Sequence, residues 1–299
     1  MQTPDSIVPL DRLTVCPTQD GSLTFFSERF GEALHSTYGA KTEADLKFVV
    51  PTGIIQKGQG QRRIDILDVC FGLGYNSASA LDALPNCAVN IWGLENNWEV
   101  LRLAVAQQMH HLWSDRPRRV LEQLAHSPTV QDQSQDQPWQ LQLILADARQ
   151  GIHWVPDGTV DAIFFDPFSP KRCPQLWTID FLRLVTAKLK PDGYWVTYSC
   201  ASAVRSALLE LGLKLWAVEP LGRKSCGTIA SFDDSVVPQR SRHLTDLEYA
   251  ILETRAGIPY RDPLLQDSSE VIIERRKQEQ LRSDRQSSSS WLKANLEYA

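Results

Sequence analysis

The central part of the chain alternates two patterns of apolar residues. Apolar runs of strand length occur at residues 64–70, 89–95, 141–145, 160–165 and 194–198. Longer stretches with helical spacing of apolar residues separate most of them, at residues 75–84, 100–111, 177–189 and 202–211. The short runs predict buried strands and the longer stretches predict helices. Strands that alternate with helices indicate a parallel sheet covered on both faces.

Two places break this alternation. Residues 127–137 are rich in Gln, Asp and Ser and predict a surface loop. Residues 214–218 and 228–232 both predict strands, and no helical stretch lies between them. Strands joined without a crossover helix pair in the antiparallel sense. We therefore expect the sheet to end in an antiparallel hairpin, which a dinucleotide-binding sheet lacks.

The N-terminal sixty residues follow neither pattern for long. Short apolar runs at residues 23–26 and 48–50 predict strands, and residues 30–38 predict a helix between them. The glycine-rich stretch at residues 57–61 predicts a turn-rich connector. We expect residues 1–60 to form a small β-containing segment that packs on the central domain.

The chain changes character again after residue 235. Residues 243–255 and 269–282 predict helices, and the second of them is highly charged. The serines at residues 287–290 predict a mobile tail. The expected organisation is thus the N-terminal segment, a central α/β domain at residues 61–235 and a C-terminal helical extension at residues 236–299.

Composition and charge narrow the class of protein. The six cysteines are widely separated and form no Cys-x-x-Cys pair, which argues against a zinc site and a disulfide framework. No apolar run is long enough to span a bilayer, and the first residues lack the features of a signal peptide. We therefore expect a cytoplasmic protein with reduced thiols, no metal and no membrane partner. The net charge of −5 does not favour nucleic-acid binding overall, although short basic clusters allow a local patch.

The first central strand ends in a glycine loop that opens a helix. The sequence reads Asp68-x-Cys70-x-Gly72-x-Gly74, and the helix expected from residue 75 follows directly. Glycines let the backbone approach a ligand, and free N–H groups at a helix N-terminus favour a nucleotide-type ligand. The alternative is a tight turn without a ligand, and the loop by itself does not identify which ligand binds.

Carboxylates at the ends of three successive strands narrow the choice of ligand. Asp68 would repel a pyrophosphate but suits the amino group of a methionine moiety. Glu95 can accept two ribose hydroxyls, and Asp147, followed by Ala148, can accept the amine of adenine. Each acid could instead cap a helix. Together they favour S-adenosylmethionine over NAD, and with the final hairpin they predict the Rossmann-like fold of class I S-adenosylmethionine-dependent methyltransferases.

A proline-stiffened loop follows the fourth strand. It reads Asp166-Pro167-Phe168-Ser169-Pro170-Lys171. The prolines hold it at the point of the sheet where the reacting group is expected. The loop resembles the Asp-Pro-Pro-aromatic loop of amino methyltransferases, which holds a target nitrogen. The alternative is a capped turn in front of the next helix. We expect Asp166, Phe168 and Lys171 to be catalytic.

Taken together, these motifs resemble the MnmC-type bacterial tRNA methyltransferases, which make 5-methylaminomethyluridine at the wobble position. The similarity covers roughly residues 10–235. Its most specific part is the pattern Asp166-x-Phe168-Ser169-Pro170-Lys171-x-x-Pro174-x-x-Trp177-Thr178. Further matches are Phe26-Ser27-Glu28, Cys70-Phe71-Gly72-Leu73-Gly74-Tyr75-Asn76, Glu95, Asp147 and Gly222-Arg223-Lys224.

Two departures from the family pattern bear on function. Cys70 stands where the family has the first loop glycine, which bears on the fit around the methionine end. Many family members also continue into an FAD-dependent oxidase domain, for which this chain has no room. The resemblance therefore implies a stand-alone methyltransferase that uses S-adenosylmethionine, without FAD and without a metal. Its partner would be the anticodon loop of tRNA, and a separate enzyme would install the aminomethyl group.

The resemblance also implies roles for single residues. Asp166 would orient the amine and stabilise its positive charge, and Phe168 or Trp177 would stack on the uracil. Phe26 would lie in the substrate site. The expected phosphate contacts are Lys171, Arg172, Arg223 and Lys224. The expected cofactor-binding set is Asp68, Cys70, Phe71, Gly72, Gly74, Asn76, Glu95, Asp147, Ala148 and Asp166.

Other functions are also compatible with the sequence. A methyltransferase or an aminopropyltransferase acting on a small-molecule amine would suit the isoelectric point of about 5.7. Against the polyamine route, no second acidic motif of the kind a polycation needs is evident beside Asp166. A protein that binds the cofactor without catalysis fits less well, because the Asp166-Pro167-Phe168 loop is intact. Asp68 and the final hairpin disfavour an NAD oxidoreductase.

Overall fold

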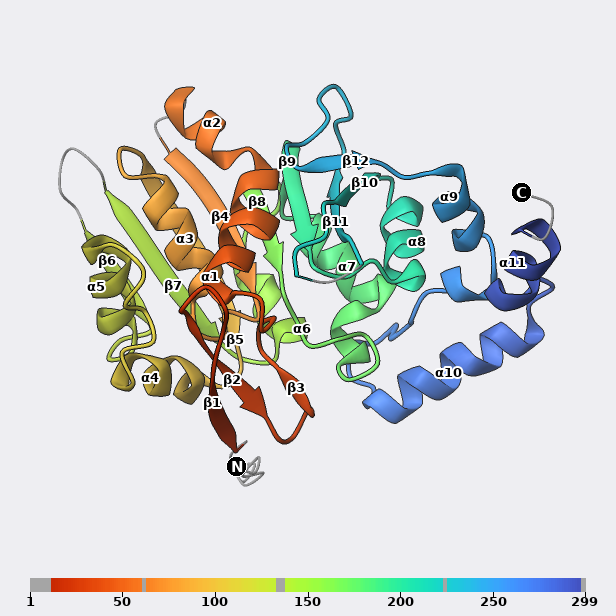
Figure 1. Ribbon diagram of the computed structural model, residues 1–299, viewed down its shortest axis with the longest axis horizontal. Coiled ribbons are helices and arrows are strands. Elements are labelled where there is room, and N and C mark those ends of the chain that lie inside the picture. The colour runs from red at the N-terminus through yellow and green to blue at the C-terminus, as the bar shows by residue number, and fades with distance from the viewer. Residues whose placement is uncertain (1–11, 61–62, 133–137, 223–224, 297–299) are drawn as a thin grey trace.

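The computed structural model describes residues 12–60, 63–132, 138–222 and 225–296, which are built around a nine-stranded sheet (Figure 1). In spatial order its strands are β12 (Ser241–His243), β10 (Lys214–Val218), β11 (Gly227–Ser231), β9 (Leu189–Thr197), β8 (Val160–Phe165), β4 (Arg63–Val69), β5 (Ala88–Glu95), β7 (Trp139–Leu145) and β6 (Thr129–Asp132). The five strands from β9 to β7 are parallel, and the remaining pairs are antiparallel. The predicted α/β fold and its late β10–β11 hairpin are confirmed.

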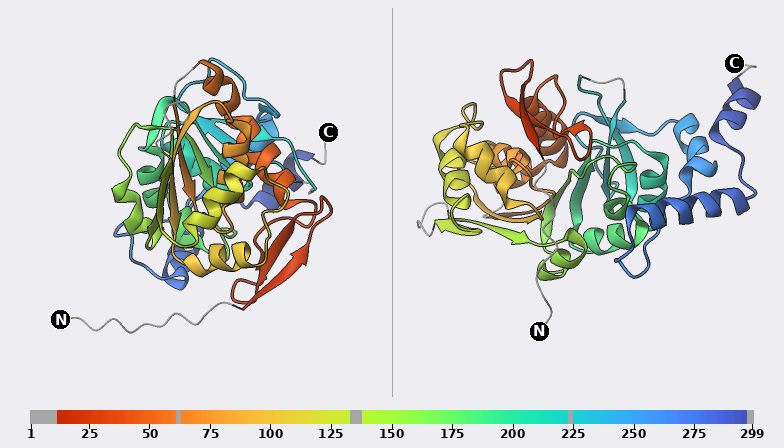
Figure 2. Two further views of the ribbon diagram at one scale, coloured as in Figure 1. Left: turned by 90° about the vertical axis from the view of Figure 1, so that its left-hand side faces the viewer. Right: turned by 90° about the horizontal axis from the view of Figure 1, so that it is seen from below.

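Helices cover both faces of this sheet (Figure 2). One face carries α3 (Tyr75–Ala83), α4 (Trp98–Ala106) and α5 (Asp115–Leu124), and the other carries α6 (Ala148–Gly151), α7 (Ile179–Thr186) and α8 (Ser202–Glu210). Each face has its own cluster of buried apolar side chains. All six residues of β8 are buried, and six of the seven in β4 are. A strand covered on both sides needs such a continuous apolar run, which is why the sequence revealed these strands.

The N-terminal segment differs from its prediction in two of its elements. A small antiparallel sheet, β1 (Leu13–Pro17), β2 (Leu23–Ser27) and β3 (Glu32–Ala33), precedes a helical stretch that starts with α1 (Ala40–Glu43) and ends with α2 (Ile54–Gly60). The helix predicted at residues 30–38 is wrong, because β3 and turns lie there. The strand predicted at residues 48–50 is also wrong.

The error at residues 48–50 has a simple physical origin. Phe48 and Val49 are buried in the core from within a helical turn, Ala44–Val49. Three adjacent apolar residues do not distinguish a buried strand from a buried turn of helix. The connector predicted at residues 57–61 is likewise the end of α2, as far as it is described.

Smaller differences concern the ends of elements. The loop predicted at residues 127–137 contains the edge strand β6, and α5 was not foreseen. The helix predicted at residues 177–189 is shorter, because a 3-10 turn, Pro174–Trp177, precedes α7 and strand β9 already begins at Leu189. The serine-rich stretch predicted as a tail begins helix α11 (Ser288–Leu296).

The C-terminal extension lies at the edge of the molecule opposite α5 and β6 (Figure 1). It contains α9 (Asp246–Leu252), α10 (Ser269–Arg282) and α11. Ser268 caps α10 through a hydrogen bond from the backbone N–H of Val271. Among the described helices, none combines the length and the apolar composition that a membrane span requires.

The parallel strands bring their carboxyl ends to one edge of the sheet. Val69 of β4 pairs with both Leu94 of β5 and Phe165 of β8, and Glu95 pairs with Leu145 of β7. The loops that follow these strands therefore lie next to one another, where ligands bind in sheets of this kind.

Candidate active site

A cavity of about 1110 Å³ opens at this carboxyl edge. Most of its lining comes from three parts of the chain: the small N-terminal sheet with its following turn, the loops after β4, β5, β7 and β8, and the first turns of α10. Helices α1 and α3 and the loops after β9 and β10 contribute further residues. Its size and its mixed polar and apolar lining suit a nucleotide together with a second reactant.

The glycine loop after β4 forms one wall through an unusual backbone. Cys70, Gly72 and Gly74 all have positive φ angles, of 65°, 54° and 80°. A side chain on Gly74 would place its Cβ 2.7 Å from the Phe71 ring, so glycine is required there for packing. Cys70, Phe71 and Gly72 line the cavity, whereas Gly74 lies behind them as the N-cap of α3. Cys70 thus has a left-handed backbone conformation, which glycine adopts without strain. This conformation accounts for the glycine expected here from the MnmC-type pattern.

Glu95 fastens this loop from the neighbouring strand. Its Oε2 accepts a hydrogen bond from the backbone N–H of Gly72 at 2.8 Å. Its Oε1 accepts from the backbone N–H groups of Asn96 and Asn97 at 2.9 and 2.8 Å. Burial raises the pKa of Glu95, and the three backbone donors oppose that shift. The carboxylate is therefore fixed on the cavity wall, where its remaining lone pairs can accept hydroxyl groups.

Asp68 lies beneath the loop and away from the cavity wall. Its side chain is fully buried, and its Oδ2 accepts from the Ser77 hydroxyl at 2.6 Å. Burial raises the pKa of Asp68 to about 7. This position does not support the predicted contact with a methionine amino group. The sequence located the acid near the end of β4 but could not tell that this residue points into the interior.

Asp147 both caps a helix and lines the cavity. Its Oδ1 accepts from the backbone N–H of Arg149 at 2.9 Å, which makes it the N-cap of α6. The Arg149 guanidinium also donates to Oδ2 at 2.8 Å. Burial disfavours ionisation of Asp147, but the hydrogen bonds from Arg149 outweigh it and lower the pKa. The predicted cap and the predicted cavity position are therefore both found, and Ala148 lies beside them on the wall.

Asp166 directly follows β8 and lines the cavity. Its Oδ2 accepts from the Asn76 amide at 3.1 Å. Burial, followed by the negative charge of Glu43, raises the pKa of Asp166 to about 8. Asn76 also carries a buried Oδ1 that has no hydrogen-bond partner among the described residues. The site thus offers two acceptors to a ligand with N–H groups.

Glu43 on α1 is a second acid of the same cavity. Its Oε1 accepts from Lys47 at 2.7 Å, and its Oε2 accepts from the backbone N–H of Ser36 at 2.9 Å. The sequence shows no second acidic motif beside Asp166, but the structure adds this single acid to the same cavity. No motif marks Glu43 in the sequence, because it reaches the cavity only through the packing of the N-terminal segment on the sheet.

Phe168 lines the cavity in direct contact with the N-terminal segment. Its ring stacks on Phe30, with centroids 4.0 Å apart and the planes inclined by 15°. Beside this pair, Glu32 accepts from the Ser169 hydroxyl at 2.6 Å and from its backbone N–H at 3.3 Å. The loop that holds Asp166 is therefore tied to the turn around β3. The resemblance at Phe26-Ser27-Glu28 pointed to the beginning of this turn but missed Phe30 and Glu32.

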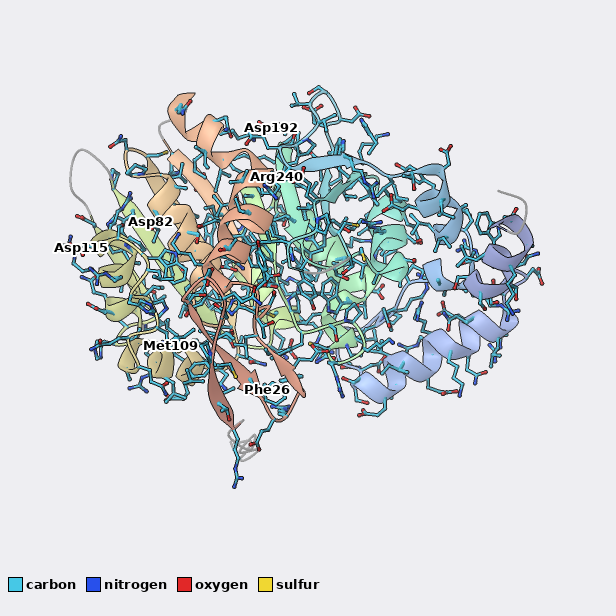
Figure 3. All side chains as sticks on the ribbon, viewed as in Figure 1. Phe26, Asp82, Met109, Asp115, Asp192 and Arg240 are labelled. Carbon is cyan, nitrogen blue, oxygen red and sulfur yellow. The ribbon has the colours of Figure 1, made fainter. Side chains whose placement is uncertain are left out.

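The predicted substrate residues have different positions. Lys171 and Arg172 are exposed and line the cavity together with Arg29, which no sequence motif marks. Trp177 is fully buried, and its Nε1 donates to the Phe168 carbonyl at 2.8 Å, so the prediction that it could stack on a base is wrong. Phe26 lies at the outer end of the small sheet and does not line the cavity (Figure 3). Arg223 and Lys224 lie outside the described residues.

These donors and acceptors fit an S-adenosylmethionine molecule. Glu95 suits the ribose hydroxyls, Asp147 suits the adenine amine, and the unpaired Oδ1 of Asn76 suits an ammonium group. The glycine loop after β4, in which Cys70, Gly72 and Gly74 have positive φ angles, lets the backbone approach the ligand closely.

Comparison with known proteins agrees with this fit. Residues 107–233 match a protein family described as S-adenosyl-L-methionine-dependent methyltransferase. The crystal structure of MnmC2 from Aquifex aeolicus is similar over 92% of this chain and 87% of that one, with 32% sequence identity and a TM-score of 0.76. An uncharacterized protein from Methanocaldococcus jannaschii is 30% identical over 263 residues, which are 87% of this chain and 70% of that protein.

A second group of relatives consists of longer proteins. The tRNA 5-methylaminomethyl-2-thiouridine biosynthesis bifunctional protein MnmC of Azoarcus sp. (strain BH72) is 24% identical over 225 residues. These residues are 73% of this chain but 35% of that protein, so the chain spans about a third of its length.

Proposed function

Because this chain belongs to the MnmC-like family of S-adenosyl-L-methionine-dependent methyltransferases, we propose that it methylates 5-aminomethyl(-2-thio)uridine at the wobble position of tRNA. The acceptor is the primary amine, and the product is 5-methylaminomethyl(-2-thio)uridine. The aminomethyl group is installed by a separate enzyme.

The observation that carries this proposal is the position of Asp166. Its carboxyl group lies beside Asn76, directly after β8, and lines the same cavity as Glu95, Asp147 and Lys171. A group at that point faces both reactants. An acid with a raised pKa suits an amine acceptor, because it exchanges a proton with the amine near neutral pH.

The residues of the chain act mainly by positioning. Bound S-adenosylmethionine supplies a methyl group that is already activated, so correct alignment contributes most of the rate. Glu95 holds the ribose and Asp147 the adenine. Asp166 accepts an N–H of the substrate amine, orients its lone pair and stabilises the positive charge that develops on nitrogen. Asn76 fixes the Asp166 carboxylate through the 3.1 Å hydrogen bond.

The rim of the cavity supports a nucleic-acid substrate. Arg29, Lys171 and Arg172 line it, and their charges can contact phosphates on either side of an extruded uridine. Phe168 offers an aromatic face for the uracil. The printed name of the Azoarcus relative, which refers to tRNA 5-methylaminomethyl-2-thiouridine, supports the same substrate.

Methyl transfer from labelled S-adenosylmethionine tests the proposal. The full chain is incubated with tRNA that carries aminomethyluridine, with the same tRNA lacking the aminomethyl group, and with free spermidine. We expect label only in the first, and a loss of about 100-fold or more in rate for Asp166→Ala. Equal labelling of both tRNAs would exclude the amine as acceptor.

The alternative is a small-molecule amine as acceptor. The observation that favours it is Glu43, a second acid in the cavity that could hold another positive charge of a polyamine. Its charge is already paired with Lys47 at 2.7 Å, which leaves less of it for a substrate. Labelling of spermidine without labelling of tRNA would establish this alternative.

A further inference from the structure

One arginine joins the C-terminal extension to the cavity. The Arg149 Nη1 donates to Asp262 Oδ2 at 2.9 Å and to the backbone carbonyl of Asp267 at 3.1 Å. The Nη2 of the same guanidinium donates to Asp147 Oδ2 at 2.8 Å. Arg149 thus connects the loop after β7 with the loop that leads into α10.

Asp262 is built firmly into the extension. Its side chain is fully buried, and its Oδ1 accepts from the backbone N–H groups of Gln266 and Asp267 at 3.1 and 3.2 Å. Its own backbone N–H donates to Asp180 Oδ2 on α7 at 2.7 Å. A buried carboxylate is costly unless it is paired. Asp262 is therefore held in one position, where its Oδ2 accepts the hydrogen bond from Arg149 Nη1.

The other end of the guanidinium fixes Asp147. Because the fork of an arginine is planar and rigid, holding one nitrogen restricts the others. The Arg149 side chain is only 13% exposed, which leaves it little freedom to turn away. The Asp147 carboxylate is thereby kept ionised and in one orientation on the cavity wall.

The extension also supplies part of the cavity wall. Ser269, Glu270 and Ile273, in the first turns of α10, line the same cavity. Ser269 donates to the Gln175 side chain at 2.9 Å, which joins α10 to the turn in front of α7. The match to the methyltransferase family ends at residue 233, so it assigns no role to these residues.

We propose that the C-terminal extension is a working part of the cofactor site. Asp262 is a positioning residue that holds Arg149, and Arg149 presents the Asp147 carboxylate to the 6-amino group of adenine. This inference rests on the adenine position in the proposed function. An ionised carboxylate can only accept hydrogen bonds, so the site discriminates against a purine that carries hydrogen in place of the amine.

Binding of two ligands tests the inference without any tRNA. Calorimetry on the full chain gives the dissociation constants of S-adenosylhomocysteine and of its analogue with hydrogen in place of the 6-amino group. In Asp262→Asn we expect the constant for S-adenosylhomocysteine to rise about tenfold. The constant for the analogue changes little, so the preference for the amine falls by the same factor.

A matched variant controls for general damage to the extension. Glu279→Gln breaks the 3.3 Å ion pair with Arg261, next to Asp262, but does not touch Arg149. It should keep the wild-type preference. The double variant Arg149→Gln/Asp262→Asn removes the buried Arg149–Asp262 pair as a unit, so no unpaired charge is left at position 262. Asp147, which is 40% exposed, loses its guanidinium partner, and the preference should be lost as in Asp262→Asn.

The outcomes separate this inference from the proposed function. If the folded Asp262→Asn chain kept the wild-type preference, the role of Asp262 would be contradicted. Equal weakening of both ligands would also contradict it, because the extension would then shape the cavity without acting through Asp147. If the wild-type chain bound neither ligand, the proposed cofactor site itself would be wrong.

Discussion

At the scale of single residues, two of the acids that line the cavity have pKa values shifted in opposite directions: Glu43 downward and Asp166 upward. Glu43 is paired with Lys47 and with the backbone of Ser36; burial opposes its ionisation, but these contacts outweigh it and lower its pKa. Among the described residues no cation forms a hydrogen bond with Asp166, so burial and the charge of Glu43 raise its pKa despite a smaller opposing effect of Lys47. Two acids whose pKa values are pushed apart can take different roles in one site. Glu43 stays ionised, and Asp166 exchanges its proton near neutral pH.

We predict that kcat/KM rises as the pH passes through about 8, because Asp166 must lose its proton to accept the amine. In Glu43→Gln/Lys47→Met the repulsion between Glu43 and Asp166 is absent, so this rising limb of the pH profile of kcat/KM should move to lower pH. The double change removes the ion pair as a unit and leaves no buried charge alone. The titration of the substrate amine does not depend on Glu43. An unshifted profile would therefore assign the limb to the substrate.

The raised pKa of Asp166 also makes the stability of the folded chain depend on pH. The pKa of Asp166 in the folded chain lies above its ordinary value of 3.8, so the folded chain binds more protons than the unfolded chain between about pH 4 and pH 8. Ionisation of Asp166 therefore lowers stability as the pH rises through this range. Asp166→Asn should melt at a higher temperature than wild type at pH 8, and the difference should shrink towards pH 4. Melting curves at both pH values would show it, and a less stable variant at pH 8 would disprove it.

At the scale of elements, the sequence predicted what depends on neighbours along the chain. Strands β4 and β8 are runs of buried residues, and the loop from Asp166 to Lys171 is contiguous, so both could be recognised. The N-terminal segment could not, because Phe48 and Val49 are buried by contacts with distant parts of the chain. Local patterns carry little information on such contacts.

The same limit applies to the site. Glu95 and Asp147 follow strands and were found from that position. Glu43 and Phe30 join the cavity from short N-terminal elements, and the Arg149–Asp262 pair spans residues far apart in sequence. Asp68 was predicted to contact the cofactor because it lies near the end of a strand, but its side chain is buried in the core. Position at a strand end does not reveal whether a side chain faces the cavity or the core.

The small N-terminal sheet provides a test at the scale of elements. Phe30 stacks on Phe168 in the cavity, whereas Phe26, four residues earlier, is 37% exposed and outside it. Phe30→Ala should raise KM for the tRNA by about tenfold, because it removes the ring that holds Phe168 in place, and stacking of one aromatic on a base is worth about 1–3 kcal/mol. Phe26→Ala, the matched control, should change KM little. If Phe26→Ala had the larger effect, the uridine would approach from the outer face of the small sheet.

At the scale of the whole molecule, the net charge is negative, whereas the basic side chains Arg29, Lys171 and Arg172 line the cavity. The chain carries 36 acidic and 31 basic side chains that are charged at pH 7, and its net charge of −5 would repel a polyanion at a distance. Around the cavity, however, Arg29, Lys171 and Arg172 lie together. Binding of tRNA would then depend on a few phosphate contacts at this rim, and not on a large basic surface.

We predict that affinity for tRNA falls with salt, with a modest slope. Each phosphate contact to a single strand contributes about −0.7 to the slope of log K against log salt concentration. Lys171→Ala/Arg172→Ala should therefore make the slope shallower by about 1.4 and leave the affinity for S-adenosylhomocysteine unchanged. Arg118→Ala/Arg119→Ala on α5, away from the cavity lining, should leave both quantities as in wild type. Fluorescence anisotropy with labelled tRNA at several salt concentrations measures these slopes. An equal reduction in both double variants would mean that tRNA contacts extend across the sheet to α5.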